Sequence, residues 1–494
     1  MEATLRKALD EGVTVVTSHR RQARQIRYRY ASANQDEGRE AWESPQVMGW
    51  DDWLVQLHQD ITWSGYSAPR NQRKLLSHFQ EQVLWEKIID AGDTELDDVA
   101  GTARQAASAW GLVQAYRLPD PAKADHSSED VLAFGHWMRR YFGRCRELSL
   151  IDHARLADII APALRAGAVP PPSSLLLVGF DGFTPQQRIL LKTMEDLGTG
   201  MDRYKGARVE VQPLGLRCAT VGDEYLAAAR FVRRILASDR PGNTAVLAPD
   251  LQRDRKRIER IFDDVLMPGS SLPGSNVAGR PYNMAVGERF EQNPLVAAAL
   301  RLCGLLRPLA RFDDLSSLLR SPFLRGGTTE APLRARFEVW LRRHNIALAP
   351  VTKLPELLAR FAQDADQQHD DTVTGGVFDA VSKHADAAAG KLRASQWSAL
   401  FRSLLDDCGW PGDAALDSAL YQTAERWRSL LDEMSGLDFL TGPMGLNQAQ
   451  ALLRRLASNI KFQPQTPDLA VQILLPEQAT GLQFDHLWWC GTHA

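Results

Sequence analysis

The chain has 494 residues, more than one hydrophobic core ordinarily supports, and its 44% hydrophobic and 24% charged composition is typical of a globular protein. A formal net charge of −3 excludes a uniformly basic nucleic-acid coat, although it leaves room for a local basic channel. The five cysteines form no C-x-x-C pair, which argues against zinc and iron–sulfur sites and favours a reducing compartment. Because no signal core and no run of about eighteen apolar residues occurs, we expect a cytoplasmic protein without membrane contact.

The first half of the chain contains a strand, a basic helix, a helical region and a second strand. Residues 13–17 form a β-branched run, and an Arg-rich helix follows after a polar turn. From about residue 42 to residue 168 the apolar spacing is helical, until the prolines of residues 169–174 end it. Residues 174–180 are mostly apolar without interruption, which indicates a parallel strand covered on both faces.

A second alternation of helices and strands begins near residue 217. It comprises a helix at 222–238, a strand at 243–249, a helix at 250–266, a helical region at about 293–460 and a last pair of strands at 469–475 and 484–491. Strands that alternate with helices predict an α/β fold with parallel sheets. Ligand sites of such folds lie at the carboxyl ends of the strands, so the chemistry of this chain is expected there.

The first predicted strand ends in "TSHRRQAR". A phosphate-binding loop needs glycines, whose backbone N–H groups surround the phosphates, and a Lys followed by Ser or Thr. This stretch has neither, and no G-x-x-x-x-G-K occurs elsewhere, so ATP binding is not expected. The basic residues Arg20, Arg21, Arg24 and Arg27 predict contact with a nucleic-acid backbone, or else a solvated helix face with acidic partners.

The second strand end carries Gly179, Phe180 and Asp181, and the next helix opens with Thr184 and Gln187 in the order Thr-Pro-x-Gln. This order resembles the magnesium-binding strand end of UvrD/RecB-like superfamily 1 helicases, where an Asp–Glu pair stands in place of Gly179 and Phe180. One displaced carboxylate, Asp181, is a poor substitute for a metal-and-base pair. A buried strand followed by a Thr-capped helix is the alternative interpretation.

Two further stretches resemble the second motor domain of these helicases. The helix at 222–238 and the following "AVL" strand have the order and spacing of that domain's start, with a generic α/β unit as the alternative. The stretch "PEQATGLQFD" is similar to H-K-A-K-G-L-E-F-D of active relatives. Gly481 and Asp485 match that motif, whereas Glu477 and its polar neighbours replace the charged positions.

Together with "RSPFLRGG" (residues 320–327), these motifs make the chain resemble the AddB- and RecC-type proteins, the inactivated helicase-like partners of bacterial recombination helicase–nucleases. The resemblance implies two RecA-like, P-loop NTPase-type lobes with helical insertions. The first domain would cover residues 1–215 with an insertion at about 42–168, and the second residues 216–494 with an insertion at about 293–460. It also implies that the second domain is incomplete, and that in complete relatives a PD-(D/E)xK nuclease domain follows the position of Ala494.

The same resemblance implies a DNA repair and recombination protein that binds and channels single-stranded or forked DNA without sequence specificity. It implies no catalytic residue, cofactor or metal in this stretch, and a helicase or nuclease subunit as partner. The candidate DNA contacts are Arg20, Arg21, Arg24, Arg27 and Arg325. The alternatives are a scaffold that docks a partner subunit without touching DNA, and an NTPase with an unusual nucleotide site.

Other motifs lend no support to metal-dependent chemistry. "PDLQRDRK" (residues 249–256) holds two Asp only four residues apart, whereas a nuclease site of this type needs acids on separate strands of a hairpin. No carboxylate constellation joins His136 and His153, so a metal site is not predicted there.

Overall fold

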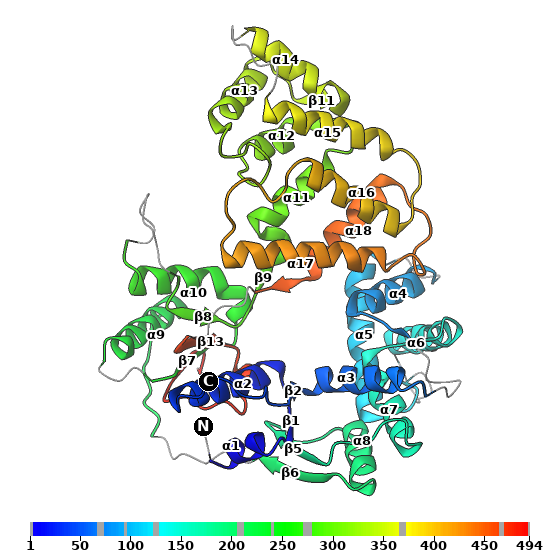
Figure 1. The fold of residues 1–494 in the computed structure, drawn as a ribbon, viewed down its shortest axis with the longest axis vertical. Coiled ribbons are helices and arrows are strands. Elements are labelled where there is room, and N and C mark those ends of the chain that lie inside the picture. The colour runs from blue at the N-terminus through cyan, green and yellow to red at the C-terminus, as the bar shows by residue number, and fades with distance from the viewer. Residues whose placement is uncertain are drawn as a thin grey trace. The chain divides into compact units, whose positions relative to one another are not determined.

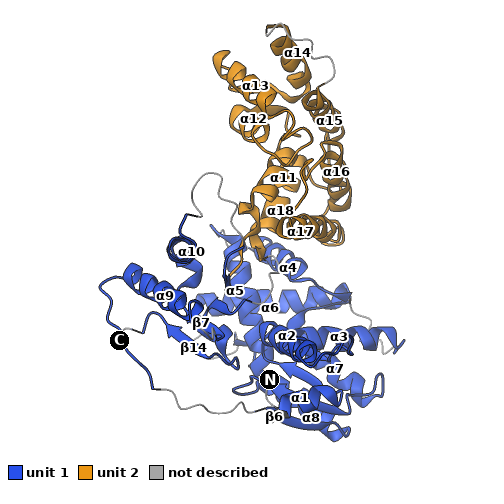
Figure 2. Ribbon diagram, turned by 60° about the vertical axis from the view of Figure 1, so that its left-hand side comes forward, with its two compact units in different colours: residues 1–285, 466–494 blue, residues 286–465 orange. Residues whose placement is uncertain are grey.

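The computed structural model describes residues 3–66, 74–92, 96–121, 128–204, 212–238, 242–269, 279–364, 372–463 and 469–492 (Figure 1). The chain divides into two compact units, Met1–Ala285 with Thr466–Ala494 (unit 1) and Val286–Gln465 (unit 2), which Figure 2 colours separately. Unit 1 contains two four-stranded parallel sheets and unit 2 is mostly helical, so the α/β class is confirmed. The predicted domain boundary at residues 215/216, which lies within unit 1, stays a prediction.

The first sheet of unit 1 has the strand order β2-β1-β5-β6, with all strands parallel. Its strands are β1 (Thr14–Thr17), β2 (Val47–Gly49), β5 (Ser174–Val178) and β6 (Gly200–Tyr204). The predicted strands at 13–17 and 174–180 correspond to β1 and β5. The prediction missed β2, which has only 3 residues, and β6, whose Asp202 and Arg203 are exposed polar residues.

Helices cover both faces of this sheet, as the apolar run of β5 predicted. One face carries α1 (Ala3–Asp10) and α2 (Arg20–Asp36), and the other carries α3 (Trp50–Trp63), α7 (Leu156–Arg165) and α8 (Pro185–Asp196). Leu176 and Val178 pack on the first face, and Leu175 and Leu177 on the second. Burial of one such side chain contributes about 1.5–3 kcal/mol, so β5 is held from both sides.

A helical region of unit 1 lies between β2 and β5 in the chain. Its elements are α4 (His78–Asp90), α5 (Val99–Tyr116) and α6 (Glu129–Glu147). The rings of Trp85 and Tyr141 stack with centroids 4.0 Å apart, and Trp110 packs against both, so three buried aromatic side chains join the three helices. Two short parallel strands, β3 (Lys74–Leu75) and β4 (Leu150–Ile151), lead into α4 and into the 3-10 turn η2 (His153–Arg155).

The second sheet of unit 1 has the order β14-β7-β13-β8 and is also fully parallel. Its strands are β7 (Thr244–Leu247), β8 (Tyr282–Met284), β13 (Val471–Leu474) and β14 (His486–Trp489). The last pair of strands was predicted, but β13 and β14 lie on opposite sides of β7 and do not pair with each other. Helices α9 (Val221–Leu236) and α10 (Leu251–Leu266) pack against one another, and the 3-10 turn η5 (Pro476–Ala479) follows β13.

Unit 2 is mostly helical, as its apolar spacing predicted. Its helices are α11 (Pro294–Gly304), α12 (Phe312–Leu319), α13 (Ala331–Arg343), α14 (Leu354–Asp364), α15 (Val373–Ala387), α16 (Ala394–Asp407), α17 (Ser418–Ser435) and α18 (Leu446–Asn459). Two antiparallel strand pairs were not predicted, namely β9 (Glu288–Arg289) with β12 (Lys461–Phe462) and β10 (Leu309–Arg311) with β11 (Leu348–Pro350). Among the helices of the described residues, none has the length and apolar character needed to span a bilayer.

Candidate functional site at the junction of the two sheets

Several backbone groups of the turn after β1 are hydrogen-bonded within the protein. The Ser18 N–H donates to the carbonyl of Val178 at the end of β5 (3.0 Å), and the Gln22 and Ala23 N–H groups donate to the carbonyl of His19 (3.1 and 3.3 Å). The Thr17 hydroxyl also donates to the His19 carbonyl (2.8 Å). These bonds fix the start of α2 directly after β1.

Gln22 on the first turn of α2 connects the two sheets of unit 1. Its side chain is only 2% exposed, and its Nε2 atom donates to the backbone carbonyl of Gly481, 3.0 Å away. Gly481 lies in the connection between η5 and β14 of the second sheet. The loop that resembles a motor motif is therefore bonded directly to the helix that follows β1.

Two glycines with left-handed backbone conformations pack against the Gln22 side chain. Gly179, at the end of β5, has a φ of +75°, and Gly481 has a φ of +73°. A Cβ atom on Gly179 would lie 2.3 Å from the Gln22 Oε1, and one on Gly481 would lie 2.2 Å from its Nε2. Any side chain at Gly179 would therefore meet both backbone strain and a steric clash. These two effects favour glycine at position 179.

Two further side chains of α2 reach the second sheet. The Arg21 guanidinium donates to Oε1 of Gln472 on β13 (3.2 Å), and the Arg29 guanidinium donates to the carbonyl of Gln483 (2.9 Å). Each such hydrogen bond contributes about 0.5–1.5 kcal/mol net. With the Gln22 bond, α2 therefore forms three side-chain links across the junction.

The predicted arginine cluster is distributed between different environments. Arg20 pairs with Asp52 on α3 (2.5 Å), and Arg21 faces Gln472, whereas Arg24 and Arg27 are exposed on α2. Arg325 belongs to unit 2, where its backbone N–H donates to the Cys408 carbonyl (3.0 Å) and its side chain is exposed. Arg20, Arg24 and Arg27 are therefore all accessible from solvent on α2, and Arg20 is so while paired with Asp52.

An aromatic group follows Gly179 at the end of β5. The Phe180 ring packs edge-on against Trp50 (centroids 5.9 Å apart) and contacts Phe183 (5.1 Å). The Phe180 carbonyl accepts a hydrogen bond from the Arg203 guanidinium (2.5 Å). Asp181 follows as an exposed residue. This arrangement stabilises the strand end by packing, and it presents no pair of carboxylates to a magnesium ion.

The remaining motif residues have structural partners. Thr184 caps α8: its hydroxyl accepts from the Gln187 N–H (3.3 Å), and the Gln187 side chain accepts from the Thr184 N–H (2.9 Å). Asp485 accepts from the Asn243 N–H (2.8 Å) and so joins the starts of β7 and β14. Glu477 is exposed on η5. The Thr-Pro-x-Gln order is therefore a capping box in this protein.

The two Asp of residues 249–256 serve the start of α10. Arg253 pairs with Asp250 (2.8 Å) and with Asp254 (3.3 Å), and the Tyr225 hydroxyl donates to Asp254 (2.9 Å). Burial alone raises the pKa of Asp254, but the hydrogen bonds from Arg253 and Tyr225 lower it below its usual value. Both acids lie at one helix start and not on two strands of a hairpin, as the sequence interpretation expected.

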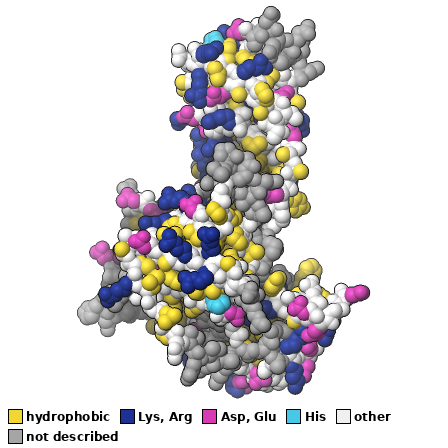
Figure 3. Space-filling model, turned by 90° about the vertical axis from the view of Figure 1, so that its left-hand side faces the viewer, with side chains coloured by type: hydrophobic (Ala, Val, Ile, Leu, Met, Phe, Trp, Pro, Cys, Tyr) yellow, Lys and Arg dark blue, Asp and Glu magenta, His cyan; other side chains and the backbone are white. Residues whose placement is uncertain are grey.

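A basic surface on α9 and α10 was not predicted from the sequence. Figure 3 shows basic and hydrophobic side chains gathered on the side of unit 1 where these helices lie. The exposed cations of the two helices are Arg230, Arg233, Arg234, Arg253, Lys256, Arg257 and Arg260. The sequence could have indicated this basic surface, because the cations recur on the exposed faces of two amphipathic helices. The same spacing is also typical of any solvated helix, so it does not by itself predict a binding surface.

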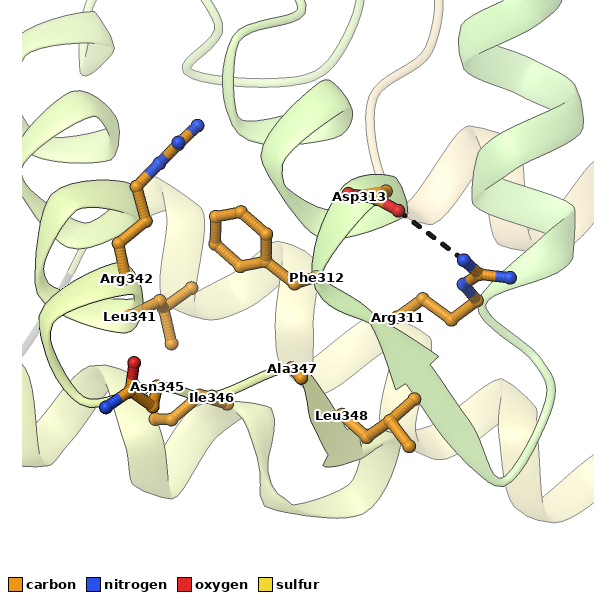
Figure 4. Close-up of a pocket in the computed structure, with 9 residues that line it drawn as sticks. All are labelled: Arg311, Phe312, Asp313, Leu341, Arg342, Asn345, Ile346, Ala347 and Leu348. Carbon is orange, nitrogen blue, oxygen red and sulfur yellow. Dashed lines mark hydrogen bonds and ion pairs between the residues drawn. The ribbon is translucent and has the colours of Figure 1, made fainter.

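Unit 2 contains a surface cavity of about 860 Å³ near β10 and β11. Figure 4 shows Arg311 and Arg342 on opposite sides of Phe312 in this cavity. Arg311 pairs with Asp313 (3.5 Å), and Arg342 pairs with Glu338 (2.5 Å) and lies over the Phe312 ring (5.1 Å). Because both cations already have acidic partners, the cavity offers an anionic ligand little uncompensated charge.

No protein-family model and no curated protein sequence matches this chain.

Proposed function

We propose that this chain is a DNA-handling protein of the repair and recombination class, built on two RecA-like lobes, which binds DNA without turning over ATP. The contact between Gln22 and Gly481 carries this proposal. It lies where two parallel sheets meet at their strand ends, which is where a motor of this class would hold its nucleotide. The amide of Gln22 and two left-handed glycines fill that place here.

DNA would be bound through its phosphates by exposed cations of unit 1. Arg24 and Arg27 on α2 supply one set, and the basic surface on α9 and α10 supplies a second. Contacts of this kind depend on charge and not on base sequence, and they weaken as salt rises because counterions are released from the DNA. A helicase or nuclease subunit would then act on the DNA that this protein holds.

The first test is the salt dependence of DNA binding by the purified chain. Fluorescence anisotropy with single-stranded and forked DNA should show binding that weakens steeply with salt and does not depend on base sequence. Charge reversal of Arg24 and Arg27 to Glu should weaken binding and lower the slope of log K against log salt by about 1.4, at about 0.7 per lost phosphate contact. The same reversal at Arg233 and Arg260 tests the second set.

A matched control is charge reversal of Arg104 and Arg146, two exposed arginines on α5 and α6. It changes the net charge of the protein equally and should affect the slope much less. Salt-independent binding, or equal loss in all three variants, would contradict the proposed DNA contacts.

The scaffold alternative has one observation in its favour. Leu487 and Trp489 on the outer strand β14 are 51% and 52% exposed, and exposed apolar side chains on an edge strand are typical of a docking surface. A scaffold would keep its partner subunit when Arg24 and Arg27 are reversed, and it would show no salt-dependent affinity for DNA.

A further inference from the structure

Two parallel strands bring two histidines and a glutamate together in the helical region of unit 1. Strand β3 leads into α4, whose first residue is His78, and strand β4 leads into η2, whose first residue is His153. Because the carboxyl ends of parallel strands meet at one edge, the two rings stack with centroids 4.2 Å apart. Glu81 lies one turn further along α4, and a ligand atom from each of the three residues lies within 4.8 Å of the others.

We propose that His78, Glu81 and His153 bind a zinc ion, which ties α4 to the turn after β4. Two imidazole nitrogens and one carboxylate oxygen are a donor set that zinc accepts, with water as a fourth ligand. Bonds of about 2.0–2.1 Å in a tetrahedral site place ligand atoms about 3.3 Å apart. Binding would therefore draw the three ligand atoms together from their present spacing of up to 4.8 Å.

The carboxyl group of Glu81 is buried beside a second acid. Glu81 is 9% exposed, and Asp152, which lies near enough to interact with it, is fully buried. The nearest cation, Arg155, is already paired with Asp152 (2.6 Å), in a salt bridge whose members are both buried. A buried carboxylate without its own cation is costly, and a bound zinc ion would supply that charge.

His153 offers a buried ring nitrogen to the cluster. Its ring is partly buried and stacks on the ring of His78. Its Nδ1 atom is buried and has no hydrogen-bond partner among the described residues. A ring nitrogen without a hydrogen-bond partner is placed to donate a lone pair to a metal ion.

Two local charges oppose a cation at this place, and both are offset. The positive end of the α4 dipole lies at His78, but the capping box of Ser77 and Gln80 already satisfies N–H groups of the first turn. Arg20 lies near His153, and its own charge is paired with Asp52. His78 is exposed, so its ring can turn out of the stack, and an ion can enter from solvent on that side.

The test is a metal titration of the full chain, without an affinity tag and after removal of metal by a chelator. Zinc is added in competition with a chromophoric chelator, and cobalt(II) is added in a parallel experiment. We expect one equivalent of zinc to bind, and cobalt to give the intense visible absorption of a four-coordinate ion. The variants His78→Ala, His153→Ala and Glu81→Gln should each weaken zinc binding by at least about 100-fold, because loss of outer hydrogen-bond partners alone costs up to that much.

His136→Ala is the matched control, because His136 is an exposed histidine on α6 outside the cluster. It should leave the affinity for zinc and the cobalt spectrum unchanged. Glu81→Gln separates loss of a ligand from loss of the fold, because it removes a buried charge at nearly constant side-chain shape. Without metal, this variant should have a Tm no lower than that of the metal-free parent. A parent protein that binds zinc no more tightly than the His78→Ala/His153→Ala double variant would overturn the proposal, as would an equal loss in His136→Ala.

Discussion

The side-chain amide of Gln22 donates a hydrogen bond to the backbone carbonyl of Gly481, and this 3.0 Å contact joins a helix on the first sheet to a loop of the second sheet. The bond crosses a place where the neighbouring backbone of Gly179 also approaches closely. A cleft that opens and closes around a nucleotide would have to break this hydrogen bond in each cycle. The DNA-holding function proposed above does not require the bond to break.

Substitution of Gly179 by Ala should destabilise the protein through two separable effects. The left-handed φ costs about 1–2 kcal/mol for a residue with a Cβ, and the clash with Gln22 adds about 1–3 kcal/mol of overpacking. Gly167→Ala is the matched control, because Gly167 has the same φ of +75° and a Cβ there would meet nothing within 4 Å. Urea denaturation should therefore show a larger loss for Gly179→Ala than for Gly167→Ala.

A double variant separates the clash from the backbone strain. In the Gln22→Ala background the clash partner is gone, so Gly179→Ala should cost only about 1–2 kcal/mol, as in the control. Equal costs of Gly179→Ala in both backgrounds would show that Gln22 does not fill the space beside Gly179.

The sequence predicted the buried strands β1, β5, β7 and β13, because they leave uninterrupted apolar runs, but it missed the buried strand β8, which has only 3 residues. The sequence could not predict the contact between Gln22 and Gly481, because the two residues are 459 positions apart in the chain. The sequence predicted strand ends without a pair of acids, but not which side chains pack there. That information lies in the packing of loops from two sheets, which no local periodicity encodes.

Thr184 should behave as a helix cap and not as part of a motor. Its hydroxyl accepts from the Gln187 N–H, so Thr184→Ala should lower the free energy of unfolding by about 1 kcal/mol, whereas Thr184→Ser should retain most of it. Neither variant should change DNA affinity. A loss of DNA binding in folded Thr184→Ala protein would contradict the capping interpretation and favour a direct role for the motif.

Mg-ATP should neither bind to the purified chain nor be hydrolysed by it. A ligand present at 100 times its Kd stabilises a protein by about 2.7 kcal/mol, which a thermal melt detects easily. We expect no shift of Tm with millimolar Mg-ATP and no release of phosphate above the buffer rate, with or without DNA. A nucleotide-dependent shift of Tm that the Gln22→Ala variant enlarges would instead support the NTPase alternative.

The His78, Glu81 and His153 cluster illustrates a second limit of sequence interpretation. His153 was considered beside His136, which is nearer in the chain, but β3 and β4 place it against His78. The H-x-x-E spacing of His78 and Glu81 at a helix start was the available signal. It became informative only when the pairing of two strands of 2 residues each was known, and strands of that length leave no periodic pattern.

The stability of unit 2 should depend on pH through Glu330. The Glu330 carboxylate accepts from the backbone N–H groups of Val373 and Thr374, both at 2.8 Å, at the start of α15. Burial acts to raise the pKa of this carboxyl, but the hydrogen bonds from Thr374 and Val373 outweigh burial and hold the pKa below its usual value. A depressed pKa in the folded state means that the stabilisation is complete above the unfolded pKa of about 4.3 and is lost as pH falls through the folded value.

Glu330→Gln should therefore lower the free energy of unfolding by about 1–2 kcal/mol near neutral pH, since hydrogen bonds to a charged group are the stronger ones. The difference from the parent protein should shrink as the pH falls below about 4. Glu356→Gln is the control, because Glu356 is 64% exposed in its salt bridge with Lys353 and should change stability by less than about 0.5 kcal/mol. Urea denaturation at a series of pH values measures both variants, and a Glu330→Gln loss that is constant with pH would mean that the carboxylate charge does not stabilise α15.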